Sequence, residues 1–581
     1  MRRLTGLAVA ACAAMTVVPQ FAVAGLPGPD RQSRSVGSLA AGKPVLLVTF
    51  ADRPDRDAAE TRLAGIGTVR PSVPEVGVWE VVAADPDGVR AAALARPGVE
   101  RAEWSLQRRI HALTDPRRPA TVTWPLQVLP EPTDPLYVDK AKQWGLRLGS
   151  WSAGLSAYAR PTIAILDSGI DSTHEEWRGN GVLVFPRSTF RRVDRAEDIS
   201  VFGHGTHVAG IAAAPANGVG VVGVAPAGGD PSDPYTSKVM PVQISDSQGR
   251  STDSTMIRGI RWAVNHGAKV INISSGGPGY SQAFQDTIDW AFRRGAVVVA
   301  SVGNEGDQEN FLNYPAAYDH VIGVGAQCDR VVDVNFGCPL PFARAKWSNF
   351  NPSVDVIAPG VNVPSSIPLA VADGRFAPGY GLKDGTSMAA PYVAGAAALV
   401  FGAHPGATPF QVTRLLESTA YRAATAQPRN STDGWGQVNP LAAAQAQAPV
   451  DDLVEPNDDV RWLPKGLDYR PGRTPVTVTA WADANDDRID AYPVLLRKGE
   501  RLKVTITTSA GKLGVVVFRP GVQSLARQTE KQFDAKLLGR TRRSTPRVRT
   551  VAVRARESGR HLVVVGAFLR GGEYSLRISR R

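Results

Sequence analysis

Cysteine is scarce in this chain, which has three in 581 residues. Cys12 lies near the N-terminus, and Cys328 and Cys338 stand close together in one later segment. Closing a loop of about ten residues stabilises a protein by roughly 3 kcal/mol in the chain-entropy model. A disulfide here would therefore brace one loop and would not decide the fold. In an exported protein we expect Cys328 and Cys338 to form this local disulfide, and two free thiols are the alternative.

Beyond the N-terminus, we expect no apolar run long enough to span a membrane. Residues 1–24 begin with Arg2 and Arg3, continue with an apolar run over residues 4–18 and end on small residues up to Ala24. This pattern predicts a secretory signal peptide cleaved after Ala24, and hence a secreted, extracellular protein. A retained anchor is disfavoured because a spanning helix needs about 20 apolar residues. Lipidation at Cys12 is disfavoured because apolar residues continue after it. We expect no later membrane span.

The composition excludes a disordered or fibrous chain, since 43% of the residues are apolar and 21% are charged. A prior of roughly 150 residues per domain predicts about three or four units. The net charge of +12 is concentrated in the tail, where residues 451–581 hold 26 Lys and Arg against 15 Asp and Glu. Eight arginines lie between Arg540 and Arg560. A solvated strand face explains them, and attraction to an anionic wall polymer or surface is the functional alternative.

The first folded unit is expected over residues 43–110, after a polar linker at residues 25–41. Its pattern predicts a strand (43–50), a helix ending on Gly67 (56–67), a strand (77–84), a helix (86–98) and a closing strand (99–105). This order indicates a small two-layer α+β domain. The segment from Leu113 to Asp134 is interrupted by prolines and predicts an extended connector, a plausible cut site.

A large α/β domain is expected over residues 132–447. Apolar runs such as "TIAILD", "KVINIS", "AVVVAS" and "HVIGVGA" alternate with helical stretches, which predicts a doubly wound, mostly parallel sheet covered on both faces. After a polar linker, residues 455–581 lose helical periodicity and predict an all-β sandwich. Its expected strands are residues 476–482, 500–509, 513–520, 547–555, 561–569 and 573–579.

Three segments of the large domain carry the residue types of nucleophilic catalysis. Asp167 follows a strand in "TIAILDSGID", His204 lies in "GHGTHVAG", and Ser387 precedes an Ala-rich helix in "DGTSMAAPYVAGAAALV". A serine hydroxyl needs an imidazole to take its proton, and the imidazole needs a carboxylate to fix its tautomer. A serine at a helix N-terminus also places backbone N–H groups near a developing oxyanion. Asn304, in "VVVASVGNEG", could donate its amide to the same oxyanion.

Together the motifs "DSGID", "HGTHVAG", "GNEG", "YPAAY", "APG" and "GTSMAAP" resemble the subtilisin-like serine protease family throughout this domain. The resemblance implies peptide-bond hydrolysis through an acyl-enzyme on Ser387, with Asp167 and His204 completing the triad. It implies an oxyanion hole from Asn304 and the Ser387 N–H group, and a structural role for His207. It further implies that Ser274, Ser275 and Gly276 form the wall of the pocket for the residue before the scissile bond. Ser275 replaces a common Leu and Asn313 replaces a common Gly, which makes the pocket more polar or narrower.

The resemblance also implies a calcium site, a leader function and a role for the tail. Asp134, Glu176 and Asn217 would supply hard oxygen ligands to Ca²⁺, although Glu176 replaces the usual Asp. Residues 43–110 resemble the family's inhibitory propeptide. The tail is similar to the β-sandwich that follows many secreted bacterial peptidases.

The sequence therefore predicts a secreted serine endopeptidase, made as an inhibited precursor and acting on proteins or peptides. A peptide acyl transferase on the same scaffold is one alternative, and an inactive surface-binding relic is another. We expect Ca²⁺ but no organic cofactor, no nucleic-acid partner, and a monomeric protein.

Overall fold

A computed structural model describes most of the chain beyond the predicted signal peptide. The described residues are 44–83, 88–111, 133–138, 143–148, 160–179, 181–228, 237–371, 373, 376, 378–422, 429–449, 451, 469, 475–482, 489–508, 513–522, 525, 535–541, 548–567 and 572–580. The predicted signal peptide, Cys12 and most of the connector lie outside these residues.

The leader unit is a four-stranded antiparallel sheet with two helices and a 3₁₀ turn. Its sheet order is β2-β3-β1-β4. The elements are β1 (Val45–Phe50), α1 (Arg56–Arg62), β2 (Thr68–Val73), η2 (Pro74–Val76), β3 (Val78–Val82), α2 (Val89–Leu94) and β4 (Val99–Trp104). Strand β2 is an addition to the expected order. It contains Pro71 and lies at the sheet edge, the position where proline is tolerated in a strand but weakens the sequence signal.

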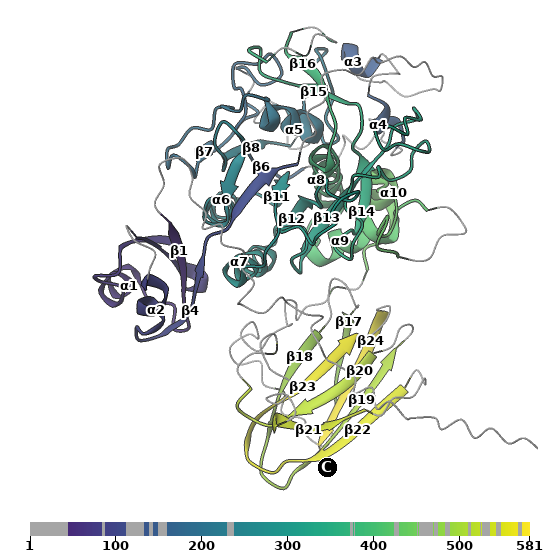
Figure 1. The fold of residues 1–581 in the computed structure, drawn as a ribbon. Helices are drawn as coiled ribbons and strands as arrows, with labels where there is room; N and C mark the ends of the chain where they lie inside the picture. The colour runs from purple at the N-terminus through teal and green to yellow at the C-terminus, as the bar shows by residue number, and fades with distance from the viewer. Residues whose placement is uncertain are drawn as a thin grey trace, which may run out of the picture.

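A short strand, β5 (Gln107–Ile110), leaves this unit and enters the large domain. It lies between β9 (Arg250–Thr252) and β11 (Ser275–Gly276) and pairs with both in antiparallel fashion. The leader is thus hydrogen-bonded into the large domain through a strand that follows its own sheet after two residues. In Figure 1 the leader unit lies beside helices α6 and α7 of that domain.

The large domain is built on a seven-stranded parallel sheet of order β14-β13-β12-β10-β6-β8-β7. Along β6 the side chains alternate between two apolar cores: Ile163 and Ile165 face one, and Ala164 and Leu166 face the other. Both faces are therefore covered, as the continuous apolar strands predict. The strands are β6 (Ile163–Asp167), β7 (Arg187–Ser188), β8 (Val239–Gln243), β10 (Val270–Ile273), β12 (Val297–Ser301), β13 (Val321–Gln327) and β14 (Val356–Pro359).

Helices divide between the two faces of the sheet. Apolar residues of α5, α8, α9 and α10 belong to one core, and those of α6 and α7 to the other. The bounds are α3 (Pro135–Val138), α4 (Trp144–Leu148), α5 (His204–Ala213), α6 (Asp253–Asn265), α7 (Gln282–Arg293), α8 (Thr386–Ala403), α9 (Pro409–Ser418) and α10 (Pro440–Gln445), with the hairpin β15 (Val363–Ser366) and β16 (Tyr380–Lys383).

Helix α8 corrects one expectation. At 18 residues with a mean hydropathy of 1.4, it is long and apolar enough to cross a membrane, although we expected no such stretch after the N-terminus. Of this helix, 89% is buried inside the protein, where it packs against the central strands. Its composition reflects a core helix surrounded by protein on all sides.

The tail consists of two four-stranded sheets, ordered β17-β24-β19-β22 and β18-β23-β20-β21, which share one apolar core. The strands are β17 (Val476–Ala482), β18 (Ile489–Leu496), β19 (Arg501–Thr508), β20 (Leu513–Phe518), β21 (Leu537–Arg540), β22 (Val548–Arg554), β23 (Gly559–Ala567) and β24 (Gly572–Arg580). The predicted strand set lacked β18 and β21, which are both edge strands. Strand β18 contains Pro493, so, like β2, it is an edge strand whose sequence signal is weakened by a proline.

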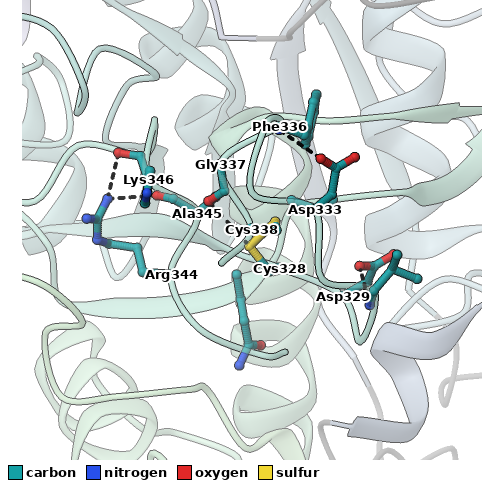
Figure 2. The surroundings of a disulfide bond; sticks show 12 residues. Cys328, Asp329, Asp333, Phe336, Gly337, Cys338, Arg344, Ala345 and Lys346 are labelled. Carbon is teal, nitrogen blue, oxygen red and sulfur yellow. Dashed lines mark hydrogen bonds between the residues drawn. A yellow bond between two sulfur atoms is a disulfide. The ribbon is translucent and has the colours of Figure 1, made fainter. Parts of the chain in front are cut away.

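The two later cysteines form a disulfide at the end of the central sheet. Cys328 directly follows β13, and its sulfur lies 2.06 Å from that of Cys338 (Figure 2). Both are buried in a small cluster with Trp347. The carboxylate of Asp333 accepts the backbone N–H of Phe336 (3.0 Å) inside the closed loop. The disulfide thus braces one loop.

Candidate active site

Asp167 and His204 meet where β6 ends and α5 begins. His204 Nδ1 lies 2.7 Å from Asp167 Oδ1, and neither side chain is exposed. The close approach of α5 to the loop after β6 depends on Gly205, because a Cβ there would lie 2.2 Å from the Gly169 carbonyl oxygen. The carboxylate can therefore fix the imidazole tautomer and stabilise its charged form. Nε2 of His204 is buried and has no hydrogen-bond partner among the described residues.

Ser387 is the second residue of α8, at the end of the helix that faces the cleft. Its Oγ donates to the Ser274 carbonyl (2.8 Å) and accepts the backbone N–H of His111 (2.9 Å). Within the described residues no hydrogen bond joins Ser387 to His204. A hydroxyl rotates freely, and catalytic hydrogen bonds often tighten only when the reaction complex forms.

The His111 carbonyl lies where the sequence predicts an oxyanion hole. It accepts a hydrogen bond from Asn304 Nδ2 (2.7 Å) and one from the Ser387 backbone N–H (3.3 Å). Asn304 Oδ1 accepts the N–H and the hydroxyl of Thr386 (3.0 and 2.9 Å), which turns the amide NH₂ toward the carbonyl. Both predicted donors thus converge on one peptide carbonyl, that of the residue directly after β5.

The three predicted wall residues run beside this leader segment. In the ladder Ser275 pairs with Ile110 and Gly276 with Arg109. The Ser274 carbonyl accepts the His111 N–H (3.3 Å). The backbone of an extended peptide in the cleft is therefore hydrogen-bonded to this wall, as in strand addition.

The His111 side chain occupies the pocket beneath this wall. Its Nδ1 lies 2.7 Å from Ser301 Oγ, and burial, with a smaller effect from His204, lowers its pKa to about 3. Asn313 donates to the Ser301 carbonyl (2.9 Å), and its amide lies against Gly276, where a Cβ would approach Nδ2 to 2.5 Å. Asn313 therefore lies at the pocket with the wall residues, and the pocket holds a neutral imidazole.

His207 lies one helical turn from His204, but its hydrogen bond goes to a residue outside the triad. Its Nε2 is 3.2 Å from the Gly381 carbonyl oxygen, and burial holds its pKa well below the usual value. It is a neutral buried group that ties α5 to β16.

Asp134, Glu176 and Asn217 lie close together, but Asn217 turns its N–H groups toward the two carboxylates, and its Oδ1 accepts the Val219 N–H (3.0 Å). Asp134 Oδ1 accepts the Asn217 N–H (3.1 Å), and Glu176 Oε2 accepts the Asn217 side-chain amide (3.4 Å). Burial, with Asp134 adding to it, raises the pKa of Glu176 to about 8, and Asp134 Oδ2 is buried without a hydrogen-bond partner among the described residues. Two neighbouring acids and an unsatisfied carboxylate oxygen fit a cation, although these described residues bring together no cluster of three acid, His or Cys groups.

Comparison with known proteins identifies the scaffold. The sequence profile of the subtilase family matches residues 159–436. The chain is 40% identical over 286 residues to Subtilisin of Bacillus pumilus, covering 49% of this chain and 90% of that protein. The chain belongs to the subtilase family. This subtilase is also 39% identical to Subtilisin E of Bacillus subtilis strain 168, of which the match spans 65%, just under two thirds.

A larger relative shares more of the subtilase chain. Fervidolysin of Fervidobacterium pennivorans is 34% identical over 335 residues, or 54% of this chain and 45% of fervidolysin. The crystal structure of fervidolysin matches 90% of this chain and 86% of its own, with a TM-score of 0.58 at 22% identity, which supports the fold. The predicted subtilisin-like fold is confirmed, and this subtilase is a serine-type endopeptidase.

Sequence reasoning missed the residues that fill the cleft of this subtilase. His111, Ser301 and Asp253 were not singled out, and neither was β5. A strand of four residues, Gln107–Ile110, gives too short a pattern to recognise. The "RRI" segment could have been noticed as a possible ligand for an acid, but its partner lies far away in the sequence.

Proposed function

We propose that this subtilase is a secreted precursor that cleaves its own chain after His111 and then hydrolyses other proteins. The observation that carries the proposal is the His111 carbonyl, which accepts hydrogen bonds from both Asn304 and the Ser387 backbone. The bond that follows it, His111–Ala112, is then the first substrate. His111 lies two residues before Leu113, the start of the connector in which we expect a cut.

The proposed reaction follows from the groups around that carbonyl. Ser387 Oγ attacks the carbonyl carbon of His111, and its proton passes to Nε2 of His204. Asp167 stabilises the imidazolium, while Asn304 and the Ser387 N–H stabilise the oxyanion. The proton then moves to the nitrogen of Ala112 as the peptide bond breaks. Water hydrolyses the resulting ester, which frees Ser387 and leaves a carboxylate on His111.

The leader is proposed to inhibit the enzyme until it dissociates. Strand β5 fills the cleft through main-chain hydrogen bonds, so it excludes other substrates. Contacts outside the cleft support continued binding after cleavage: Glu103 accepts the N–H groups of Gln282 and Ala283 at the start of α7 (3.1 and 3.0 Å). The N-terminal signal sequence supports secretion.

The test is to compare the purified wild-type chain with its Ser387→Ala variant. The wild type should lose the leader, acquire Ala112 as its N-terminal residue and hydrolyse casein. The variant should keep the leader attached, and its circular dichroism spectrum should show that it is folded. Casein cleavage that survives Ser387→Ala would falsify the proposal, and a new N-terminus elsewhere would remove the assigned role of His111.

We further propose that Asp134, Glu176 and Asn217 hold a structural Ca²⁺ ion, which would neutralise the two carboxylates. The unsatisfied Asp134 Oδ2 supports this. Dialysis against a chelator should lower the melting temperature by several degrees, and Ca²⁺ should restore it. Glu176→Gln should remove the dependence on Ca²⁺. A wild-type melting temperature indifferent to the chelator would exclude the site.

We also propose that the tail contacts an anionic surface. A groove beside β21 and β22 is lined by Lys498, Arg540, Arg549, Arg554 and Arg556. Such a groove attracts polyanions at low ionic strength. The full-length chain should bind an anionic polymer such as heparin, and added salt should release it. Equal retention after these five residues are replaced by glutamine would exclude the groove.

A further inference from the structure

Arg108 is the fourth residue before the proposed scissile bond, and its side chain is completely enclosed. Its Nε donates to Asp253 Oδ1 (2.7 Å), and neither side chain has any exposed surface. Nη1 donates to the carbonyls of Gly277 (2.6 Å) and Pro278 (3.0 Å), and Nη2 donates to that of Gly279 (2.9 Å). The guanidinium therefore makes four hydrogen bonds, all to oxygen acceptors of the peptidase domain.

The pocket offers acceptors and one negative charge to whatever occupies it. An arginine fork presents five N–H donors in a fixed plane, which suits a carboxylate and carbonyls arranged around it. Burial opposes the charge on Arg108, but Asp253 together with Tyr318 and Tyr314 outweighs burial and raises the pKa of the guanidinium. An apolar side chain in the same place would leave a buried carboxylate unpaired, which is costly.

Asp253 is positioned for this contact and is not needed to cap its helix. It is the first residue of α6, whose N-terminus is closed by a capping box between Thr252 and Thr255. The hydrogen bonds made by the Asp253 carboxylate within the described residues come from the leader, from Leu106 N–H (3.2 Å) and from Arg108. Departure of the leader therefore leaves this acid facing the emptied cleft.

The carbonyl acceptors are also held in place by the peptidase domain itself. Gly277 and Tyr314 exchange two backbone hydrogen bonds (3.0 and 2.9 Å), which fixes the turn that follows β11. The pocket is thus built before a substrate enters, so little ordering cost remains for binding.

The neighbouring arginine gives an internal comparison. Arg109 is exposed, and its backbone pairs with Gly276 and Arg250. Two adjacent arginines on one strand therefore have different surroundings, and only Arg108 enters an acidic pocket.

We propose that this pocket also selects substrates, so that the mature enzyme prefers proteins with arginine four residues before the cleaved bond, and that Asp253 determines this preference. The inference rests on the proposed function, because His111 sets the position of the scissile bond. The preferred substrates are basic segments of the form Arg-X-X-X, cut after the fourth residue. Lysine should be accepted less well, because its ammonium cannot match the fork geometry.

The test uses the self-processed enzyme and internally quenched peptides based on the leader sequence QRRIHA. One peptide keeps both arginines, one has leucine at the Arg108 position, one has lysine there, and one has alanine at the Arg109 position. We expect kcat/KM to fall about 30-fold or more for the leucine peptide, the loss expected when one partner of a buried charge pair is removed. The alanine peptide should change less than about threefold, since an exposed charge contributes little.

The enzyme variant Asp253→Leu completes a double-mutant cycle. It should cleave the leucine peptide at least as fast as the wild type does, and it should lose the preference for arginine. Because its own leader would leave Arg108 unpaired, Asp253→Leu is also made with Arg108→Leu to allow maturation. Hydrolysis of the leucine peptide by this double variant shows that the fold and the catalytic groups are intact.

The outcomes separate the two proposals. Equal kcat/KM for the arginine and leucine peptides, with cleavage after histidine in both, would overturn the inference and leave the proposed function standing. An arginine preference that survives Asp253→Leu would overturn the role of Asp253. Failure of the wild type to cut any peptide after histidine would overturn the proposed function itself.

Discussion

The leader contacts the peptidase domain through two regions, one inside the cleft and one outside it. Strand β5 lies in the cleft, where a backbone ladder that any extended peptide can form is joined by the buried ion pair between Arg108 and Asp253. The four-stranded sheet lies outside the cleft, where apolar side chains of the leader, including Leu47 and Val78, share a buried core with α6 and α7. Charged side chains add to this contact: Glu80 binds Arg258 and Arg192, and Glu75 binds Arg261. The first region presents a substrate, whereas the second belongs to this leader alone. Cutting the chain after His111 removes none of the contacts of the second region.

The largest effect is expected where β5 meets the catalytic groups. Asn304→Leu removes the side-chain donor to the His111 carbonyl, which should slow both self-cleavage and peptide hydrolysis about 10² to 10³-fold in kcat. That magnitude comes from the same substitution site in a related subtilisin. Single-turnover kinetics on the full chain and steady-state kinetics on a peptide measure the two reactions. A loss confined to KM would mean that Asn304 binds the ground state only.

The next effect distinguishes the contribution of the leader sheet to inhibition from that of the strand in the cleft. Glu80 is almost fully buried; one carboxylate oxygen accepts from Arg258 and from Ser254 (3.0 Å), and the other accepts from Arg192 (2.7 Å). Glu80→Gln leaves two arginines without their counter-charge. We expect the inhibition constant of the leader to rise about 30-fold, the lower end for a buried charge pair.

The measurement adds the isolated leader, residues 43–111, to the mature enzyme. Circular dichroism checks that the variant leader still folds. The kcat/KM of the enzyme for short peptides provides the reference, since it is independent of this sheet. If Glu80→Gln leaves the inhibition constant unchanged, the charge on Glu80 contributes nothing to inhibition, and the apolar contacts of the sheet together with β5 account for it.

Sequence reasoning succeeded where a signal is local and failed where a site is assembled from distant segments. The motifs around Asp167, His204 and Ser387 each combine a strand end or a helix start with a reactive side chain, so they could be found without a structure. The pocket of Arg108 could not, because Asp253 lies 145 residues further along the chain. An Arg-Arg pair in a sequence more often indicates a solvated surface, and only tertiary packing shows that one of the two is enclosed.

The fold shows the same division. The continuous apolar strands of the central sheet were predicted from apolar runs that alternate with helical stretches. Strands β2 and β18 were missed because Pro71 and Pro493 interrupt their patterns, and both strands are sheet edges, where a missing N–H is tolerated. Edge strands depend on a neighbour for their conformation, so their own sequence specifies them weakly.

A smaller effect is the pH dependence of peptide binding in the cleft, which involves the segment of β5 and His111 and does not involve the leader sheet. Histidine in the cleft has a pKa of about 3, against 6.5 for a free side chain, so the bound form holds fewer protons than the free peptide. Binding is therefore strongest above pH 6.5 and weakens as the pH falls below it. For a peptide cut after histidine, kcat/KM relative to the same peptide with phenylalanine should fall about tenfold between pH 7.5 and pH 5.5. The phenylalanine peptide corrects for titration of the enzyme, and a constant ratio would show that the pocket accepts the imidazolium.

The smallest effect tests whether all charged contacts of the leader sheet matter equally. Glu75 and Arg261 form hydrogen bonds of 2.9 to 3.0 Å, but their side chains are 32% and 33% exposed. Burial opposes the charge on Glu75, but Arg261 together with a backbone hydrogen bond and Asn265 outweighs burial, so the pKa of Glu75 is lowered. Because water screens such a pair, Glu75→Gln should raise the inhibition constant of the leader only about two- to fivefold, and 0.5 M salt should abolish the difference. An effect as large as that of Glu80→Gln would mean that total charge, and not burial, determines how firmly the sheet holds the enzyme.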